Sequence, residues 1–242
     1  EAWLRDLTFA QARAIPVDEI DSSFGPLVPI CKELRIGGGF ADSVFLNHLG
    51  MPTLVECKLW RNPEARRKVV GQILEYASAL KSWTFNDLQR EAAKSLGVRG
   101  FDLYEHVRSN GHPDLDEATF VDNVTRNLGS GRVLLIVLGD GIREGVEAIG
   151  DWLRGSPGLH FTFGLVDVRV FDAGMGRRIL QPRILAKTLI VDRTVISLSD
   201  PRMAIESRQF EQPEDISVVS AASGAPGWKA AFWEEVFDGL KL

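Results

Sequence analysis

The sequence predicts an α/β protein whose mixed β-sheet is flanked by helices. Two runs of β-type residues, 40–47 and 53–60, are separated by a short turn, which is typical of a hairpin. Apolar residues then recur at helical spacing over 63–80. Residues 132–138, RVLLIVL, form a continuous apolar run, which is typical of a central strand covered on both faces. A hairpin, a crossover helix and a buried strand together predict this class.

The segment before the hairpin is expected to supply a first helix and a first strand. Residues 1–13 place Trp3, Leu4, Leu7 and Ala10 at helical spacing, and Pro16 should end that helix. Residues 27–36, LVPICKELRI, predict the first strand. Three glycines follow at 37–39 and favour a turn or bulge where the backbone approaches another group closely.

The helix after the hairpin has a defined start and an apolar face. Asn62 is a good N-cap, and Pro63 suits the first helical position. We expect the face toward the sheet to consist of Val69, Val70, Ile73, Leu74, Ala77 and Leu80. Gln72 and Tyr76, one turn apart, lie at the margin of that face.

The second half of the domain should contain a helical insertion and further strands. Residues 83–130 are polar and predict helices in pieces, packed beside the hairpin. Residues 143–153 predict another helix. Segments 160–172 and 177–198 predict two long strands around the turn AGMG, and Pro182 implies an edge position or a break in the second strand. The domain is expected to span residues 1–198.

The C-terminal segment changes in composition. Residues 199–227 are rich in Ser, Pro and Gly and predict a linker. Residues 228–242 predict a short amphipathic helix with an aromatic face formed by Trp228, Phe232, Trp233, Val236 and Phe237. Such a face must be covered. We expect it to dock on the core, on a second copy or another protein, or to begin a further domain.

Composition excludes several classes of protein. The 242 residues are 45% hydrophobic and 25% charged, as in ordinary globular domains. No apolar run approaches the roughly 20 residues of a membrane helix, so no membrane partner is expected. Two cysteines, Cys31 and Cys57, exclude a disulfide framework and favour a reducing cytoplasm. No Cys/His cluster has zinc-ligand spacing, and His106 and His112 are assigned no role.

The net charge of −5 does not by itself indicate a nucleic-acid-binding protein. Phosphate contacts need local rather than global positive charge. The basic residues nearest the hairpin are Lys58, Arg61, Arg66, Arg67 and Lys68. They form either a solvated first helical turn or a phosphate-contacting patch.

Three charged side chains should meet at the hairpin. Side chains alternate along a strand, so Glu56 and Lys58 share one face while Cys57 points to the other. The turn folds the strands back and can bring Asp42 beside Glu56. Two carboxylates suit a hard divalent cation such as Mg²⁺, which keeps several waters. A neighbouring lysine can orient a water or stabilise developing negative charge.

Asp42, a hairpin, the Glu-Cys-Lys of 56–58 and a helix with Gln72-x-x-x-Tyr76 occur in that order. This arrangement resembles the PD-(D/E)xK nuclease superfamily, and the helix resembles that of its RecB-type branch. The sequence also resembles bacterial nuclease-like proteins. The resemblance covers roughly residues 15–82 and implies a restriction-endonuclease-like αβββαβ core with additional C-terminal strands.

The resemblance also implies roles for individual residues. Mg²⁺ or Mn²⁺ would be held by Asp42, Glu56 and the backbone carbonyl of Cys57. An acid before the first strand often helps such a site, and Glu19 is the candidate, with Glu33 behind it. These assignments imply a nuclease that hydrolyses phosphodiester bonds.

The remaining catalytic assignments follow the same resemblance. Lys58 would position the attacking water or stabilise the transition state. Gln72 and Tyr76 would orient the lysine or the substrate backbone. The implied partner is nucleic acid, with DNA preferred over RNA.

Two alternatives remain open from the sequence. The chain could be a nuclease fold without cleavage, serving as a nucleic-acid-binding or scaffold module. It could instead be an unrelated α/β enzyme with Cys57 as nucleophile, which would need a nearby base. The distance between the carboxylates of Asp42 and Glu56 is the first discriminating observation.

Overall fold

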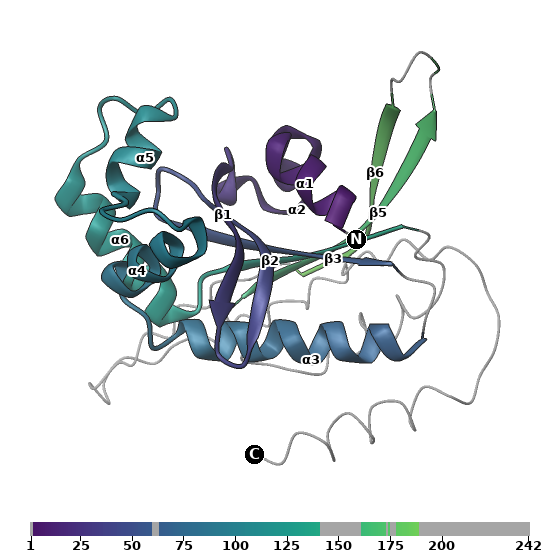
Figure 1. Ribbon diagram of the computed structural model, residues 1–242, viewed down its shortest axis with the longest axis horizontal. Coiled ribbons are helices and arrows are strands. Elements are labelled where there is room, and N and C mark those ends of the chain that lie inside the picture. The colour runs from purple at the N-terminus through teal and green to yellow at the C-terminus, as the bar shows by residue number, and fades with distance from the viewer. Residues whose placement is uncertain (1, 60–62, 141–160, 173, 175–177, 189–242) are drawn as a thin grey trace, which may run out of the picture.

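A computed structural model describes residues 2–59, 63–140, 161–172, 174 and 178–188 (Figure 1). These residues form one six-stranded mixed sheet flanked by helices, which confirms the predicted α/β class. The strands follow one another across the sheet in chain order. Their bounds are β1 Val28–Ile36, β2 Gly39–Leu46, β3 Pro52–Leu59, β4 Leu134–Asp140, β5 Thr162–Asp172 and β6 Arg178–Lys187.

The direction of the strands places three carboxyl ends together. β1, β2 and β3 form an antiparallel meander, and β3, β4 and β5 run parallel. β6 returns antiparallel to β5 as the last strand, so Pro182 lies on an edge strand as predicted. Because parallel strands end on the same side, β3, β4 and β5 share one carboxyl edge of the sheet. We call it the carboxyl edge below.

Helices cover both faces of the sheet (Figure 1). One face carries α1 Ala2–Ala10 and α2 Val17–Asp21, with 3-10 turns at Ala12–Ala14 and Ser22–Phe24. The other carries α3 Pro63–Leu80, α4 Phe85–Leu96, α5 Leu103–Ser109 and α6 Glu117–Ser130. The last three helices occupy the predicted insertion.

Two hydrophobic clusters lie on either side of the sheet. Alternation along β4 divides its apolar residues between them, which is why this strand is apolar throughout. Leu135 and Val137 face α3, whereas Ile136 and Leu138 face α1 and α2. The prediction of a central strand buried on both faces is therefore confirmed, and the same alternation fixes the faces of the functional residues on β3.

The turn between β2 and β3 is fastened by two asparagines. Asn47 Oδ1 accepts hydrogen bonds from the amides of Leu49 at 3.0 Å and Met51 at 2.9 Å. Asn127 of α6 donates from Nδ2 to the carbonyls of Leu49 at 3.2 Å and Gly50 at 2.9 Å. This turn sets the hairpin register, in which Ser43 pairs with Val55.

The N-terminal helix differs from its prediction. It ends at Ala10 instead of continuing toward Pro16, and a second short helix, α2, follows. Its buried side chains are Leu4 and Thr8, while Trp3 is 43% exposed. Of the four residues at helical spacing only Leu4 is buried, because the helix turns a partly polar face that includes Arg5 and Thr8 toward the sheet.

Some predictions fall on residues outside those that the structure describes. These are Asn62, the helix at 143–153, the end of the last strand at 189–198, the linker at 199–227 and the helix at 228–242. The C-terminal helix and its expected partner therefore stay predictions.

Candidate active site at the carboxyl edge

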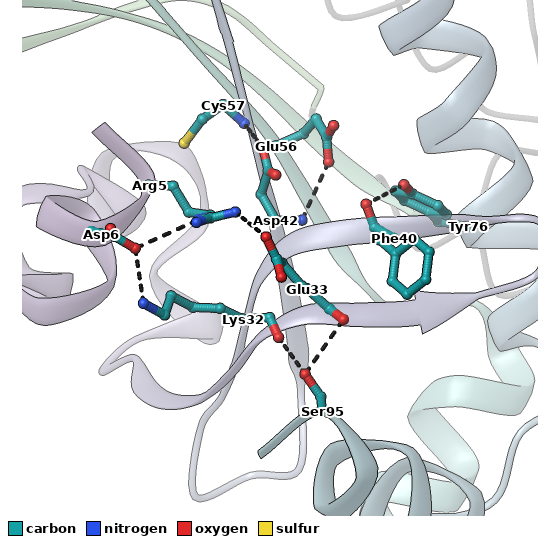
Figure 2. A network of polar contacts seen from close by, with 10 residues as sticks. All are labelled: Arg5, Asp6, Lys32, Glu33, Phe40, Asp42, Glu56, Cys57, Tyr76 and Ser95. Atoms are coloured by element: carbon teal, nitrogen blue, oxygen red, sulfur yellow. Dashed lines mark hydrogen bonds and ion pairs between the residues drawn. The ribbon is translucent and has the colours of Figure 1, made fainter. Parts of the chain in front are cut away.

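Asp42 and Glu56 lie across from each other where β2 and β3 separate. The β2–β3 ladder runs from Leu46–Pro52 to Ser43–Val55. One step further, each carboxylate bonds the backbone of the opposite strand. Asp42 Oδ2 accepts from the amide of Cys57 at 2.7 Å, and Glu56 Oε2 accepts from the amide of Asp42 at 3.4 Å (Figure 2). The expected meeting of the two acids is thus present.

Lys58 completes the group on the face of Glu56. Its Nζ lies 2.8 Å from Glu56 Oε1, in an ion pair whose carboxylate side chain is 4% exposed and whose lysine is 22% exposed. The i, i+2 spacing on β3 accounts for this contact. The ammonium is therefore held at the carboxyl edge, partly open to solvent.

The electrostatics of Glu56 reflect burial and crowding. Burial raises the pKa of Glu56, and the negative charge of Asp42 raises it further. The hydrogen bond and charge of Lys58 act in the opposite direction without cancelling these effects. A buried carboxyl beside a second carboxylate behaves in this way because each disfavours ionisation of the other.

Gln72 and Tyr76 connect α3 to β2. Tyr76 is buried, and its hydroxyl donates to the carbonyl of Phe40 at 2.6 Å (Figure 2). Gln72 Nε2 donates to the Tyr76 hydroxyl oxygen. A Cβ at Gly39 would lie 3.0 Å from that oxygen, so the predicted close approach at the glycine run is confirmed. Burial raises the pKa of Tyr76 and keeps it protonated as a donor.

Arg5 is a neighbour that the sequence interpretation missed. It reaches from α1 to Glu33 of β1 at 2.5 Å and lies 3.5 Å from Asp6 (Figure 2). Burial lowers the pKa of Arg5, but Glu33, Asp6 and Asp42 together raise it above its ordinary value. Glu33 adopts φ 55, in the left-handed region uncommon for non-glycine residues. A charged network thus backs the carboxylates from the α1 side.

Asp167 is a second residue that the sequence interpretation missed. It is 2% exposed on β5. In the sheet register, Lys58 pairs with Gly139 of β4, and Gly139 pairs with Asp167. These three residues share one face, and the middle one has no side chain. The alternation Leu165-Val166-Asp167-Val168 with a polar residue on a buried face was the available signal.

Cys57 faces away from this group. The thiol is completely buried in the cluster beneath α1 and α2. Burial, followed by the charge of Asp42, raises the pKa of Cys57 to about 12. A buried thiol that stays protonated is a poor nucleophile. These observations disfavour the alternative in which Cys57 attacks a substrate.

Glu19 makes its described contact away from Asp42 and Glu56. It is exposed on α2, and its main-chain oxygen accepts from Lys187 Nζ at 2.5 Å. Lys187 pairs with Gly164, near the amino end of β5, so the described contacts do not join Glu19 to Asp42 or Glu56. Glu33 is linked more directly to Asp42, because Arg5 forms an ion pair with Glu33 and also interacts electrostatically with Asp42. The basic side chains of Arg61, Arg66, Arg67 and Lys68 fall outside what the structure describes.

The donor set fits a hard divalent cation. Asp42 and Glu56 offer carboxylate oxygens, and the main-chain carbonyl of Cys57 is the third ligand that the resemblance implies. Within the described ranges, no group of three or more His, Cys, Asp or Glu side chains forms a metal cage. Mg²⁺ commonly uses one or two protein carboxylates and several waters. Burial first, and the charge of Asp42 second, raise the pKa of Glu56, and a cation between the two acids would favour its ionised form.

No protein-family model matches the chain, and neither a curated protein nor a solved structure matches it significantly. Among the helices that the structure describes, none combines the length and hydropathy required to span a membrane.

Proposed function

We propose that the protein is a metal-dependent nuclease that hydrolyses phosphodiester bonds, with DNA as the preferred substrate. The observation that carries the proposal is the junction of β2 and β3. There the carboxylates of Asp42 and Glu56 each accept a hydrogen bond from a backbone amide of the opposite strand, and Lys58 forms an ion pair with Glu56. The order of elements, a helix, three strands, a crossover helix and a parallel strand, supports a restriction-endonuclease-like αβββαβ core.

Each residue has a role that its surroundings allow. Asp42 and Glu56 would hold Mg²⁺ or Mn²⁺ together with the carbonyl of Cys57. When bound, the cation would act as a Lewis acid toward the phosphate and lower the pKa of a bound water. Lys58 presents a compact ammonium that can orient water or stabilise charge on a phosphate oxygen. The Gln72–Tyr76 pair positions β2 through the carbonyl of Phe40.

The direct test combines metal binding with cleavage. Asp42→Asn keeps an oxygen that can accept from the Cys57 amide, so the fold should persist while a carboxylate charge is lost. At a hundredfold excess over Kd, Mn²⁺ should stabilise the wild-type protein by about 2.7 kcal/mol. We expect to measure this as a rise in Tm. The variant should lose most of this shift and its cleavage of single- or double-stranded DNA or RNA.

Asp116→Asn is the matched control. Asp116 caps α6 by accepting from the amide of Thr119 at 2.9 Å, and asparagine caps helices equally well. It should retain both the Mn²⁺ shift and cleavage. Equal Mn²⁺ shifts in the wild type and Asp42→Asn would remove the metal site.

The same assay decides for or against a binding module. A wild-type protein that binds Mn²⁺ and nucleic acid but cleaves no substrate with either metal would be a catalytically silent nuclease fold. The observation in favour of that alternative is that only two carboxylates meet among the described residues. A protein that binds no nucleic acid would refute both functions.

A further inference from the structure

The strands β5 and β6 continue past the carboxyl edge as a two-stranded ribbon, formed by residues 168–172 and 178–183. The last register pair between β4 and β5 is Gly139–Asp167, whereas β5 and β6 remain paired as far as Asp172–Arg178. Figure 1 shows the two strands extending away from the body of the molecule. The β5–β6 ribbon therefore begins in the row of residues that contains Lys58.

One face of the β5–β6 ribbon continues the face of Glu56 and Lys58. Asp167 shares that face through Gly139 and pairs with Arg183. Because cross-strand partners point the same way and alternate residues share a face, Arg169, Phe171, Ile179 and Gln181 lie on this face too. The side chains are exposed, with Phe171 at 47% and Ile179 at 57%.

The net charge of the β5–β6 ribbon is positive, whereas that of the whole protein is negative. The ribbon residues 168–172 and 178–183 contain three basic side chains and one acidic side chain, a net charge of +2, although the protein carries −5. The Arg169 side chain is 56% exposed, and its Nε lies 3.5 Å from Asp167. Locally concentrated positive charge beside a hydrolytic site favours a polyanion over an uncharged partner.

We propose that the β5–β6 ribbon binds the nucleic-acid strand that leaves the candidate active site, with Arg169 and Arg183 on phosphates and Phe171 stacked on a base. Exposed aromatics stack on unpaired bases, and basic side chains beside them follow the phosphate backbone of a single strand. The proposal rests on the proposed nuclease function and names how its substrate is held.

The geometry sets a length for the contact. Phe171 lies four residues beyond Asp167, and Asp167 lies two strands from Lys58. In a flat sheet with about 3.3 Å per residue and about 4.8 Å between strands, the Cα atoms of Lys58 and Phe171 would be about 16 Å apart. This distance corresponds to about five nucleotides at the 3.4 Å spacing of duplex DNA.

The test uses the full chain with labelled oligonucleotides in EDTA, which prevents cleavage. The double variant Arg169→Gln/Arg183→Gln should weaken binding roughly tenfold or more and reduce the slope of log Kd against log salt by about two. The matched control is Arg90→Gln/Arg108→Gln, since Arg90 is 57% exposed and ion-paired on α4. The control should keep the wild-type affinity and slope.

Phe171 provides a second variant on an exposed position. Phe171→Ser should weaken binding of single-stranded DNA by roughly fivefold or more, and Phe171→Trp should restore it. On substrates trimmed from either end, the penalty of the double arginine variant should disappear once fewer than about five nucleotides extend toward the ribbon. Unchanged Tm values of the variants show that folding is not the cause.

Three results would overturn the proposal. If the arginine variant matches the control while wild type binds and cuts nucleic acid, the ribbon contact is wrong and the nuclease function stands. If Phe171→Ser changes the molar mass in solution but not nucleic-acid affinity, the ribbon is instead a contact between copies of this chain. If wild type binds no nucleic acid, the proposed function fails together with the contact.

Discussion

The carboxyl edge and helix α4 contain the same kind of ion pair in different surroundings. Lys58 and Glu56 are 2.8 Å apart, and Lys94 and Glu91 are 2.7 Å apart. Burial and Asp42 raise the pKa of Glu56, whereas the hydrogen bond to Lys94 lowers the pKa of Glu91. Equal distances therefore accompany opposite electrostatic effects.

The difference shows what identifies a candidate site. An exposed pair one helical turn apart, such as that on α4, contributes about 0.3–0.5 kcal/mol and serves the helix alone. The pair on β3 keeps a carboxylate buried beside a second acid, which is unfavourable for stability. Perturbed acids of this kind gather at functional sites.

The largest expected effect is on cleavage. Lys58→Ala removes the ammonium and should slow single-turnover DNA cleavage by roughly a hundredfold or more, because a positioned donor of this kind has that effect on the transition state. Binding of DNA in EDTA should change much less. Lys94→Ala should leave both unchanged. Similar cleavage rates for the two variants would remove the contrast between the pairs.

The hairpin part of the site was predictable because it depends on local pattern. Alternation along 53–60 placed Glu56 and Lys58 on one face, and the turn length brought Asp42 opposite. Arg5 and Asp167 were missed because their proximity depends on which strands and helices become neighbours. That information lies in the packing of β3, β4 and β5 and of α1, beyond any local sequence window.

The second prediction concerns stability against pH, measured by urea unfolding in EDTA. The pKa of Glu56 is raised on folding, so the unfolded chain loses its proton first and the wild-type protein loses stability as pH rises above about 4.5. Glu56→Gln removes this loss and should become relatively more stable than wild type toward pH 8.

Glu91→Gln should behave oppositely in the same measurement. The lowered pKa of Glu91 contributes stability above its ordinary value, and this contribution disappears as pH falls through the lowered pKa. The variant should therefore be slightly less stable than wild type at neutral pH and converge with it in acid. Curves of the same sign for both variants would contradict the assigned difference.

The smallest expected effect compares the two tyrosines of the chain. Tyr76 donates to the carbonyl of Phe40 at 2.6 Å, and Tyr104 donates to that of Leu115 at 2.8 Å. Tyr104→Phe should cost about 0.5–1.5 kcal/mol of stability by loss of this one hydrogen bond. Tyr76→Phe also loses the bond from Gln72 and should cost at least as much. Only Tyr76→Phe should also slow cleavage per folded molecule. Equal cleavage by both variants would assign Tyr76 to packing alone.

The fold boundaries show the same division between local and distant information. The α3 bounds, 63–80, agree with the prediction because apolar spacing marks the helix interior. The face of α1 could not be predicted from its apolar residues, since Arg5 finds an acid on β1 and Thr8 Oγ1 donates to the carbonyl of Leu4. Polar residues can face a sheet when such partners exist.

The fastening of the hairpin turn by Asn127 has a consequence for biosynthesis. A shift of one residue in strand register would exchange the faces of Glu56 and Cys57. The turn that prevents this shift is bonded to a side chain 77 and 78 residues later in the chain. A nascent chain that ends before α6 already contains Asp42, Glu56 and Lys58 but lacks this fastening. The bonds that Asn47 accepts within the turn can form as soon as the hairpin is made, whereas those from Asn127 are added only when α6 arrives.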